Sequence, residues 1–196
     1  MMVIGKGYTD RFITETEARE IFAQGLSQIE TRGKRLLFII PDSTRSGPIP
    51  LCFRLLVELL QDSVARLDFL IALGTHMPLS EDKINQHLGI TANERATKYA
   101  NVGIYNHDWQ HGLVTIGTIP ASEIAELSGG LMEQDVPIQI NKRIFDYDHV
   151  IICGYGRSGQ NLARFLEQEK VPFIALDNDP ERIREAAAAG ERVVFG

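Results

Sequence analysis

The chain has little cysteine and no run of charge of one sign. Of its 196 residues only two are cysteine, Cys52 and Cys153, and both lie in apolar surroundings far apart in the sequence. Cysteines in such surroundings are typical of small core residues, so we expect neither a disulfide nor a metal site. The net charge is −6 and the basic residues are scattered, which excludes a nucleic-acid backbone as an expected partner.

Long apolar runs are absent as well. No stretch approaches the length needed to cross a bilayer, and residues 1–11 lack the apolar centre of a signal peptide. We therefore expect a cytoplasmic protein without a membrane partner. Hydrophobic residues make up 44% of the chain, enough for a substantial buried core.

Short apolar runs alternate with polar loops and helical patterns. Runs at 36–40, 67–73 and 150–153 read as buried strands, and helical spacing occurs at 13–32, 51–61 and 80–88. Thr14 with Glu17 forms the expected capping box of the first helix, and Ser80 the cap of the last. This alternation predicts an α/β protein of three layers, a mainly parallel, Rossmann-like sheet with helices on both faces.

The segment at 113–140 follows a weaker pattern. It predicts a short strand, a turn at Pro120, a less regular region containing glycine, and a further short strand at 138–140. His107 and His111 are four apart, but neighbouring glycines disfavour a helix, so we read both as loop residues that bind no metal. Trp109 is expected to pack rather than to stack on a ligand.

Three glycines follow the strand at 150–153. Gly154, Gly156 and Gly159 suit a tight turn, the close approach of a pyrophosphate, and a helix packed on its strand. Arg157 and Ser158 lie in the same turn. Asp177 ends a second strand 23 positions after Gly154 and can accept hydrogen bonds from an adenosine ribose. The alternative is a glycine turn that binds nothing.

The nucleotide expected there is one with an unphosphorylated ribose. Asp177 would repel a 2'-phosphate, and no arginine partner is apparent nearby in the sequence. NAD(H) or an adenine nucleotide is therefore the expected cofactor, with NADP(H) binding more weakly.

Two loops in the first half carry side chains suited to chemistry. Arg45 can pair with a carboxylate through two hydrogen bonds while Asp42 accepts from a hydroxyl, which suits a hydroxy acid. His76 can act as a general base, because its ordinary pKa lies near neutrality. The alternatives are a turn residue at Asp42, a surface charge at Arg45 and a hydrogen-bonded loop residue at His76.

The last quarter of the chain resembles the nucleotide-binding domain of potassium-channel and potassium-efflux regulators. The resemblance is carried by 149–163, with its three-glycine turn, by 175–182 and by 190–196. It implies binding of NAD(H) or an adenine nucleotide, and pairing into a homodimer. It ends after a third strand, so it covers the first half of such a domain.

Residues from about 6 to about 154 resemble the N-terminal domain of the nickel-pincer lactate racemase family. The resemblance is carried by Asp42-Ser-Thr-Arg45-Ser-Gly-Pro and Leu73-Gly-Thr-His76-Met-Pro, with 104–108, 117–120 and 140–144 in support. It implies that Asp42 and Arg45 position the substrate and that His76 transfers a proton. In that family a tethered nickel cofactor takes the hydride.

The chain departs from the racemases after the strand at 150–153. There the family has a second catalytic histidine, a Ser-Gly-Gly stretch and the lysine that carries the cofactor, whereas this chain has the glycine turn. Ser128-Gly129-Gly130 is followed by no lysine, and the nickel-binding histidine of the family's later domain is missing. The nickel-pincer cofactor is therefore not expected.

Together these features predict a chimera, which we interpret as engineered; the alternatives are a natural fusion and a truncated relative. A racemase-like fragment, 1–148, and half of a nucleotide-binding domain, 149–196, are expected to share one sheet and one core. We expect no native catalytic activity and residual nucleotide binding at the glycine turn. The alternatives are a racemase-like isomerase or 2-hydroxy acid binding protein using Asp42, Arg45 and His76, and an NAD-responsive regulatory module of potassium transport.

Overall fold

A computed structural model describes residues 4–177, 179–190 and 193–195. The first half contains α1 (Glu15–Leu26), β1 (Arg35–Pro41), α2 (Ile49–Leu60), β2 (Arg66–Ala72), α3 (Glu81–Leu88), α4 (Ala92–Ala96) and β3 (Gly103–Asn106). The second half contains β4 (Leu113–Ile119), α5 (Ala121–Leu127), β5 (Val136–Asn141), the 3-10 helix η1 (Lys142–Asp146), β6 (His149–Cys153), α6 (Arg157–Gln168), β7 (Phe173–Asp177), α7 (Pro180–Ala188) and β8 (Val193–Phe195).

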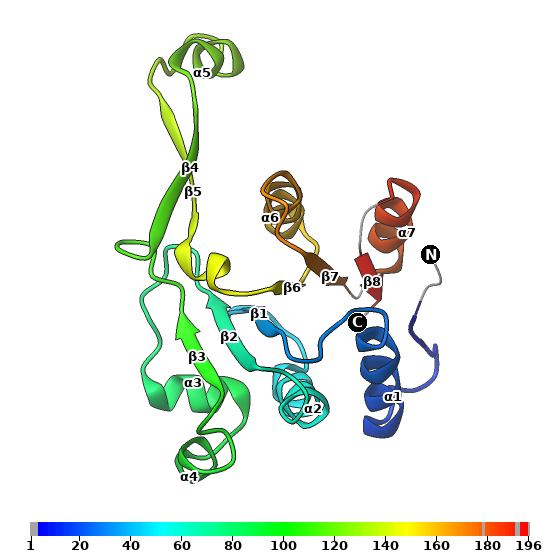
Figure 1. Ribbon diagram of the computed structural model, residues 1–196. Helices are drawn as coiled ribbons and strands as arrows, with labels where there is room; N and C mark the ends of the chain where they lie inside the picture. Colours follow the sequence, from blue (N-terminus) through cyan, green and yellow to red (C-terminus); the bar gives the residue numbers. More distant parts are fainter. Residues whose placement is uncertain (1–3, 178, 191–192, 196) are drawn as a thin grey trace.

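Six strands form one parallel sheet in the order β3-β2-β1-β6-β7-β8. The chain runs outward from the centre in both directions, from β1 through β2 to β3 and from β6 through β7 to β8 (Figure 1). Helices α1 and α2 cover one face and α6 and α7 the other. The predicted α/β fold with a parallel sheet between two helix layers is confirmed.

The two central strands are buried on both faces. Residues 36–40 of β1 are at most 8% exposed, and residues 150–152 of β6 at most 3%. The strands pair in parallel, with Leu36 opposite His149 and Ile39 opposite Ile152. Beside them Arg35 donates to Asp148 through its backbone N–H (2.9 Å) and its guanidinium (2.8 Å). Continuous apolar runs thus became the middle of the sheet, as expected for strands covered on both faces.

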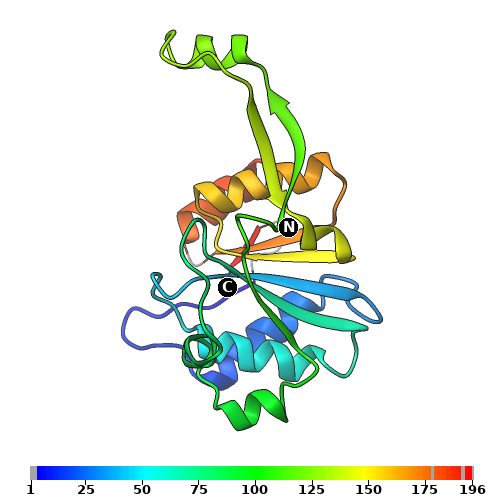
Figure 2. The ribbon, with the colours of Figure 1, turned by 90° about the vertical axis from the view of Figure 1, so that its left-hand side faces the viewer.

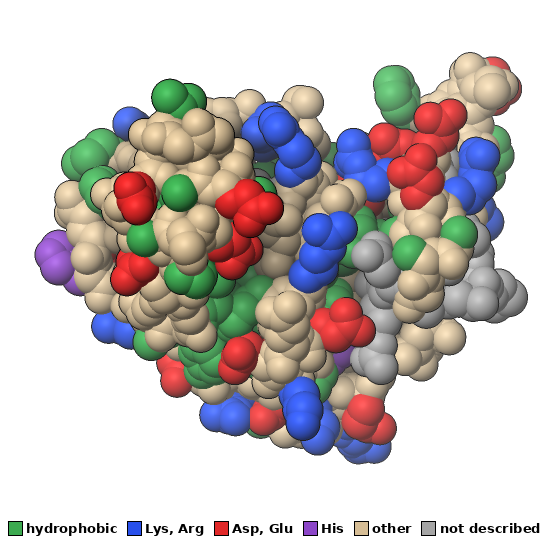
Figure 3. Space-filling view, turned by 90° about the horizontal axis from the view of Figure 1, so that it is seen from above, with side chains coloured by type: hydrophobic (Ala, Val, Ile, Leu, Met, Phe, Trp, Pro, Cys, Tyr) green, Lys and Arg blue, Asp and Glu red, His purple; other side chains and the backbone are tan. Residues whose placement is uncertain are grey.

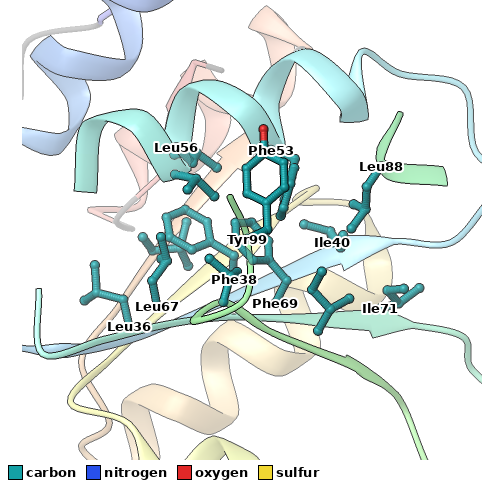
Figure 4. Packing of buried hydrophobic residues seen from close by; sticks show 14 of the residues in the cluster. Leu36, Phe38, Ile40, Phe53, Leu56, Leu67, Phe69, Ile71, Leu88 and Tyr99 are labelled. Carbon is teal, nitrogen blue, oxygen red and sulfur yellow. The ribbon is translucent and has the colours of Figure 1, made fainter. Parts of the chain in front are cut away.

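Aromatic rings pack together among aliphatic side chains in the core between the sheet and α2 (Figure 4). The Phe69 ring lies 5.2 Å from that of Phe38 and 4.9 Å from that of Phe53, which in turn lies 5.0 Å from the Tyr99 ring. Such offset and tilted ring pairs add specific contacts to the area they bury. They fix α2 over β1 and β2, and so fix the loop that joins β1 to α2.

The first helix begins as predicted and ends earlier. Thr14 caps it, with the reciprocal bond from Glu17. The helix stops at Leu26 because the next amides, those of Gln28 and Ile29, bond three residues back instead of four, which tightens the last turn. Ser80 caps α3 as expected. Within the described ranges, no helix combines the length and the hydrophobicity that crossing a bilayer requires.

An arm projects from the body between β3 and β6. Its strands β4 and β5 pair only with each other, in antiparallel fashion, and α5 lies at the tip (Figures 1 and 2). The prediction of an irregular region after Pro120 is wrong at α5, a helix that begins directly after that residue. With seven residues the helix is too short to show a clear period in the sequence. Seen from above, green and red side chains share the tip (Figure 3), where Leu127 and Leu131 are 74% and 89% exposed.

Candidate functional site

Both predicted sites lie at one edge of the sheet. Because all six strands are parallel, the loops after β1, β2 and β6 leave the sheet at its carboxyl edge. β1 and β6 are neighbours, about 4.8 Å apart as paired strands are, and the chain runs away from them in opposite directions. Such a point of reversal is where open parallel sheets place their ligands.

Asp42 and His76 meet at this edge. The Asp42 side chain is nearly buried, and its Oδ1 accepts from the backbone N–H (3.1 Å) and the hydroxyl (2.5 Å) of Thr44. Its Oδ2 lies 2.8 Å from Nδ1 of His76. Because a carboxylate only accepts, this contact assigns the proton to Nδ1 and leaves Nε2 for proton transfer, on a side chain that is 61% exposed.

The same contacts act on the ionisation of Asp42. Burial acts to raise its pKa, but the hydrogen bonds from Thr44 and His76 act in the opposite direction and prevail, so its pKa lies below the ordinary value. Asp42 is thus an anion that fixes the imidazole, the arrangement that orients a general base.

Arg45 lines a groove of about 450 Å³ that Ser43, the neighbour of Asp42 in the chain, also lines, whereas Asp42 and His76 themselves do not. Lys83 and His87 line the same groove from α3, so three basic side chains share it. His87 is held by its Nε2, 2.9 Å from the carbonyl oxygen of Pro41. We did not predict Lys83 and His87, although their spacing of four on a capped helix placed both on one face. The groove suits a small anion.

The glycine turn has the backbone geometry expected of a tight turn followed by a helix packed on its strand. Gly154 has a φ of +116°, a conformation that side chains rarely adopt. A Cβ at Gly159 would lie 2.1 Å from the carbonyl oxygen of Gly154, so only glycine lets α6 start this close to β6. A Cβ at Gly156 would meet nothing within 4 Å. The turn is therefore closed on its inner side and open at Gly156.

Helix α6 begins at the open side. Gly156 is its N-cap residue and provides no side-chain cap, so the first amides of this 12-residue helix have no partner within the helix or from the cap side chain. Arg157 is exposed beside it. The side chain of Ser158 lies outside the described part of the chain.

Asp177 ends β7 next to the turn. The residue as a whole is 5% exposed, and its Oδ2 accepts from the backbone N–H of Tyr155 at 2.6 Å. The guanidinium of Arg182 donates to both carboxylate oxygens, at 2.9 and 3.1 Å. The expectation that Asp177 has no arginine partner nearby was wrong, because the reversal of the chain between β7 and α7 brings Arg182 back onto it.

The two cysteines, two histidines and the tryptophan singled out from the sequence range from partly buried to exposed. Cys52 and Cys153 are free thiols, and burial raises the pKa of Cys52 to about 11 and that of Cys153 to about 12. His107 and His111 lie outside helices, as predicted. Nδ1 of His107 is 2.9 Å from the side-chain amide of Asn141, and burial lowers the pKa of His107. Trp109 is partly exposed.

Two family models match the chain and overlap over residues 150–156, in β6 and the glycine turn that follows it. The lactate racemase N-terminal domain matches residues 9–156, and the TrkA-N domain matches residues 150–196. The two-part composition predicted from the sequence is therefore confirmed.

Curated relatives match the second part. The K(+) efflux antiporter KefB of Alkalimonas amylolytica is 47% identical over 47 residues, which cover 24% of this chain and 7% of that protein. K(+) efflux antiporter 2 of Arabidopsis thaliana, a chloroplast protein, is 42% identical over 48 residues, 24% of this chain and 4% of its own. Potassium channel protein 1 of Methanocaldococcus jannaschii is 41% identical over 39 residues, 20% and 12% of the two chains.

A solved structure matches most of the fold. A crystal structure of a Thermotoga maritima protein superposes with a TM-score of 0.61 at 28% identity, covering 72% of this chain and 33% of that one. The chain thus spans a small fraction of the relatives it matches and a third of this structural neighbour.

Proposed function

Because the chain belongs to the lactate racemase N-terminal domain family over residues 9–156 and continues into a TrkA-N domain over 150–196, we propose that it binds NAD(H) across the sheet that the two parts share. The pyrophosphate would lie on the open side of the glycine turn, at the first amides of α6. The adenosine would lie toward Asp177, and the nicotinamide half over the ends of β1 and β2.

The strand order carries this proposal. A dinucleotide-binding sheet has two halves of three strands each, with the ligand lying across the point where the order reverses. Here β6, β7 and β8 occupy the places of the first half, and the racemase-family strands β1, β2 and β3 occupy those of the second. The strands of the second half come first in the sequence. In the sheet, however, both halves occupy the positions that they have in a dinucleotide-binding sheet.

Local geometry at the turn supports a pyrophosphate there. The open space in front of Gly156 and the first amides of α6, which the N-cap Gly156 does not cap with a side chain, suit an anion approaching the backbone. The tight contact at Gly159 holds those amides in place. We infer that Gly154, Gly156, Arg157, Ser158 and Gly159 bind the cofactor.

The nickel-pincer group does not fit this chain. Ser128, Gly129 and Gly130 lie at the end of α5, at the tip of the arm, where the Ser128 hydroxyl accepts from the N–H of Met132 at 3.0 Å. The residues that follow β6 form the glycine turn. We therefore propose that the chain has no racemase activity, and that its two parts were joined within β6, as in an engineered chimera.

Calorimetric titration with NADH tests the proposal. Gly156→Val should abolish the binding heat without unfolding the protein, because its Cβ occupies the open space where the pyrophosphate would lie. Gly7→Val is the matched control, since a Cβ at Gly7 also meets nothing within 4 Å. Absence of binding heat in the parent chain at millimolar NADH would refute the proposal.

A second candidate function is binding of a 2-hydroxy acid at Asp42, Arg45 and His76. The contact of 2.8 Å between His76 and Asp42 favours it, because that contact orients a base, and the loop that holds Asp42 also lines the basic groove through Arg45. Titration with lactate should give binding that Arg45→Leu removes, with Arg32→Leu as a control at an exposed arginine elsewhere. Equal binding by parent and Arg45→Leu would remove this candidate. A role in regulating potassium transport stays a prediction.

A further inference from the structure

The carboxylate of Asp177 already has its hydrogen-bonding capacity filled. Beyond the bonds from Tyr155 and Arg182, its Oδ1 accepts from the backbone N–H of Asp179 at 2.9 Å. Four hydrogen bonds match the roughly four acceptor positions of a carboxylate. Two of them come from backbone amides and shape the glycine turn and the start of α7. A ribose diol could bind Asp177 only by displacing Arg182.

Arg182 is the exchangeable partner in this cluster. Its side chain is 37% exposed, whereas that of Asp177 is 4% exposed. A second terminal nitrogen of the guanidinium lies 3.3 Å from Oδ2 of Asp179, at the surface. A guanidinium has five N–H donors, so Arg182 can keep one bond to Asp177 and turn the others to an anion.

We propose that Arg182 determines which ribose the site accepts, and that it lets the site bind a 2'-phosphorylated adenosine at least as well as an unphosphorylated one. This rests on the proposed function, because it concerns the adenosine end of the same ligand. Because Arg182 is hydrogen-bonded to Asp177, this carboxylate does not favour an unphosphorylated ribose by accepting from its hydroxyls. Arg182 also supplies the positive charge that a 2'-phosphate needs.

Acidic groups surround Arg182, and it must exchange one of them for the phosphate. Arg182 contacts the carboxylates of both Asp177 and Asp179, and Glu181 lies in the first turn of α7. Asp179 also accepts from the backbone N–H groups of Glu181 and Arg182, so it keeps two donors when the guanidinium turns to a phosphate. Helix α7 has nine residues, so its first turn adds positive potential on the same side. The sequence expectation that NADP(H) binds more weakly than NAD(H) is the opposite of this inference, and the titrations below separate the two.

Two small ligands isolate the adenosine end: 5'-AMP and adenosine 2',5'-bisphosphate, titrated calorimetrically against the full chain. The parent should bind the bisphosphate at least as tightly as AMP. Arg182→Leu should weaken bisphosphate binding relative to AMP about tenfold or more, the effect of losing a charge-assisted hydrogen bond. Arg184→Leu, which removes the same charge from an exposed position on α7, should leave the ratio within about twofold.

The ratio of the two affinities is insensitive to a general loosening of the turn. Arg182→Lys keeps the positive charge, so its ratio of bisphosphate to AMP affinity should stay closer to that of the parent than the ratio of Arg182→Leu does. If Arg182→Leu fails to fold, Arg182→Lys is measured in its place. A parent chain that binds AMP at least tenfold more tightly than the bisphosphate would overturn the inference alone. So would an unchanged ratio in both Arg182 variants. Failure of AMP, the bisphosphate and NADH to bind would overturn the proposed function as well.

Discussion

One nearly buried aspartate, Asp42, follows β1 and another, Asp177, ends β7, and the two are used in opposite ways. Asp42 shapes its own loop through Thr44 and turns its second oxygen to an exposed imidazole. Asp177 directs its oxygens to backbone amides and a guanidinium, and so holds the turn after β6 in place. One carboxylate orients a reactive side chain, and the other orients backbone. A phosphate needs fixed amides, whereas proton transfer needs an oriented base.

The largest expected difference in stability is between two variants of the glycine turn, Gly159→Ala and Gly156→Ala. Gly159→Ala should lower the free energy of unfolding by about 3 kcal/mol, because its Cβ would overlap the carbonyl of Gly154. Gly156→Ala should change it by less than about 0.5 kcal/mol. Urea unfolding followed by the fluorescence of Trp109, the only tryptophan, measures both.

Trp109 lies in the racemase-family part, so this probe also tests whether the parts fold together. We propose that they form one cooperative unit, because β1 and β6 are paired and buried at the middle of the sheet. Gly159→Ala should then shift the Trp109 transition. A transition that Gly159→Ala leaves unchanged, or two stable fragments after proteolysis near Asp148, would show two independent units.

Replacing Asp177 or Asp42 by alanine should lower the free energy of unfolding by amounts that differ less than those of the two glycine variants. Asp177→Ala removes the carboxylate that accepts from the amide of Tyr155 and from the Arg182 guanidinium, and we expect a loss of about 2 kcal/mol. Asp42→Ala should cost about 1 kcal/mol, since its partner His76 is exposed to water. Thermal unfolding at neutral pH compares them. Equal losses would mean that Asp42 holds its loop as firmly as Asp177 holds the turn.

The pH dependence due to Asp42 should be the smallest of these effects. Its pKa in the folded protein lies below the ordinary value, so its contribution to stability is present at neutral pH and above the unfolded pKa of about 3.9. The contribution is lost as the pH falls from there through the lower folded value. The difference in stability between the parent and Asp42→Asn should therefore shrink below about pH 4. A difference that is constant down to pH 2 would contradict the assigned pKa shift.

Local patterns were sufficient to predict the strands and the caps. The apolar runs at 36–40 and 150–153 show burial directly, and the Thr14 and Ser80 caps depend on residues three positions away. The pairs that build the sites depend on the path of the chain instead. Asp42 and His76 are 34 positions apart and meet only because β1 and β2 are parallel neighbours.

Helix α5 and the contact between Arg182 and Asp177 were also missed in the sequence, although both involve residues close together in the chain. The arginine at 182 is five positions from Asp177, but a helix must start between them to bring the side chain back. The seven residues of α5 are too few for a clear helical period. The strand order was equally invisible in the sequence, because it depends on which strands pair.

The central claim is that one ligand engages both parts of the chain at the shared edge of the sheet. Backbone amide chemical shifts measured by NMR, with NADH and with 5'-AMP, test it most directly. NADH should shift the amides of the turn at 154–159 together with those of Thr44 and His76, whereas AMP should shift the turn and leave Thr44 and His76 in place. If saturating NADH shifts the turn and leaves Thr44 and His76 where AMP leaves them, the racemase-family strands do not serve as the second half of the site.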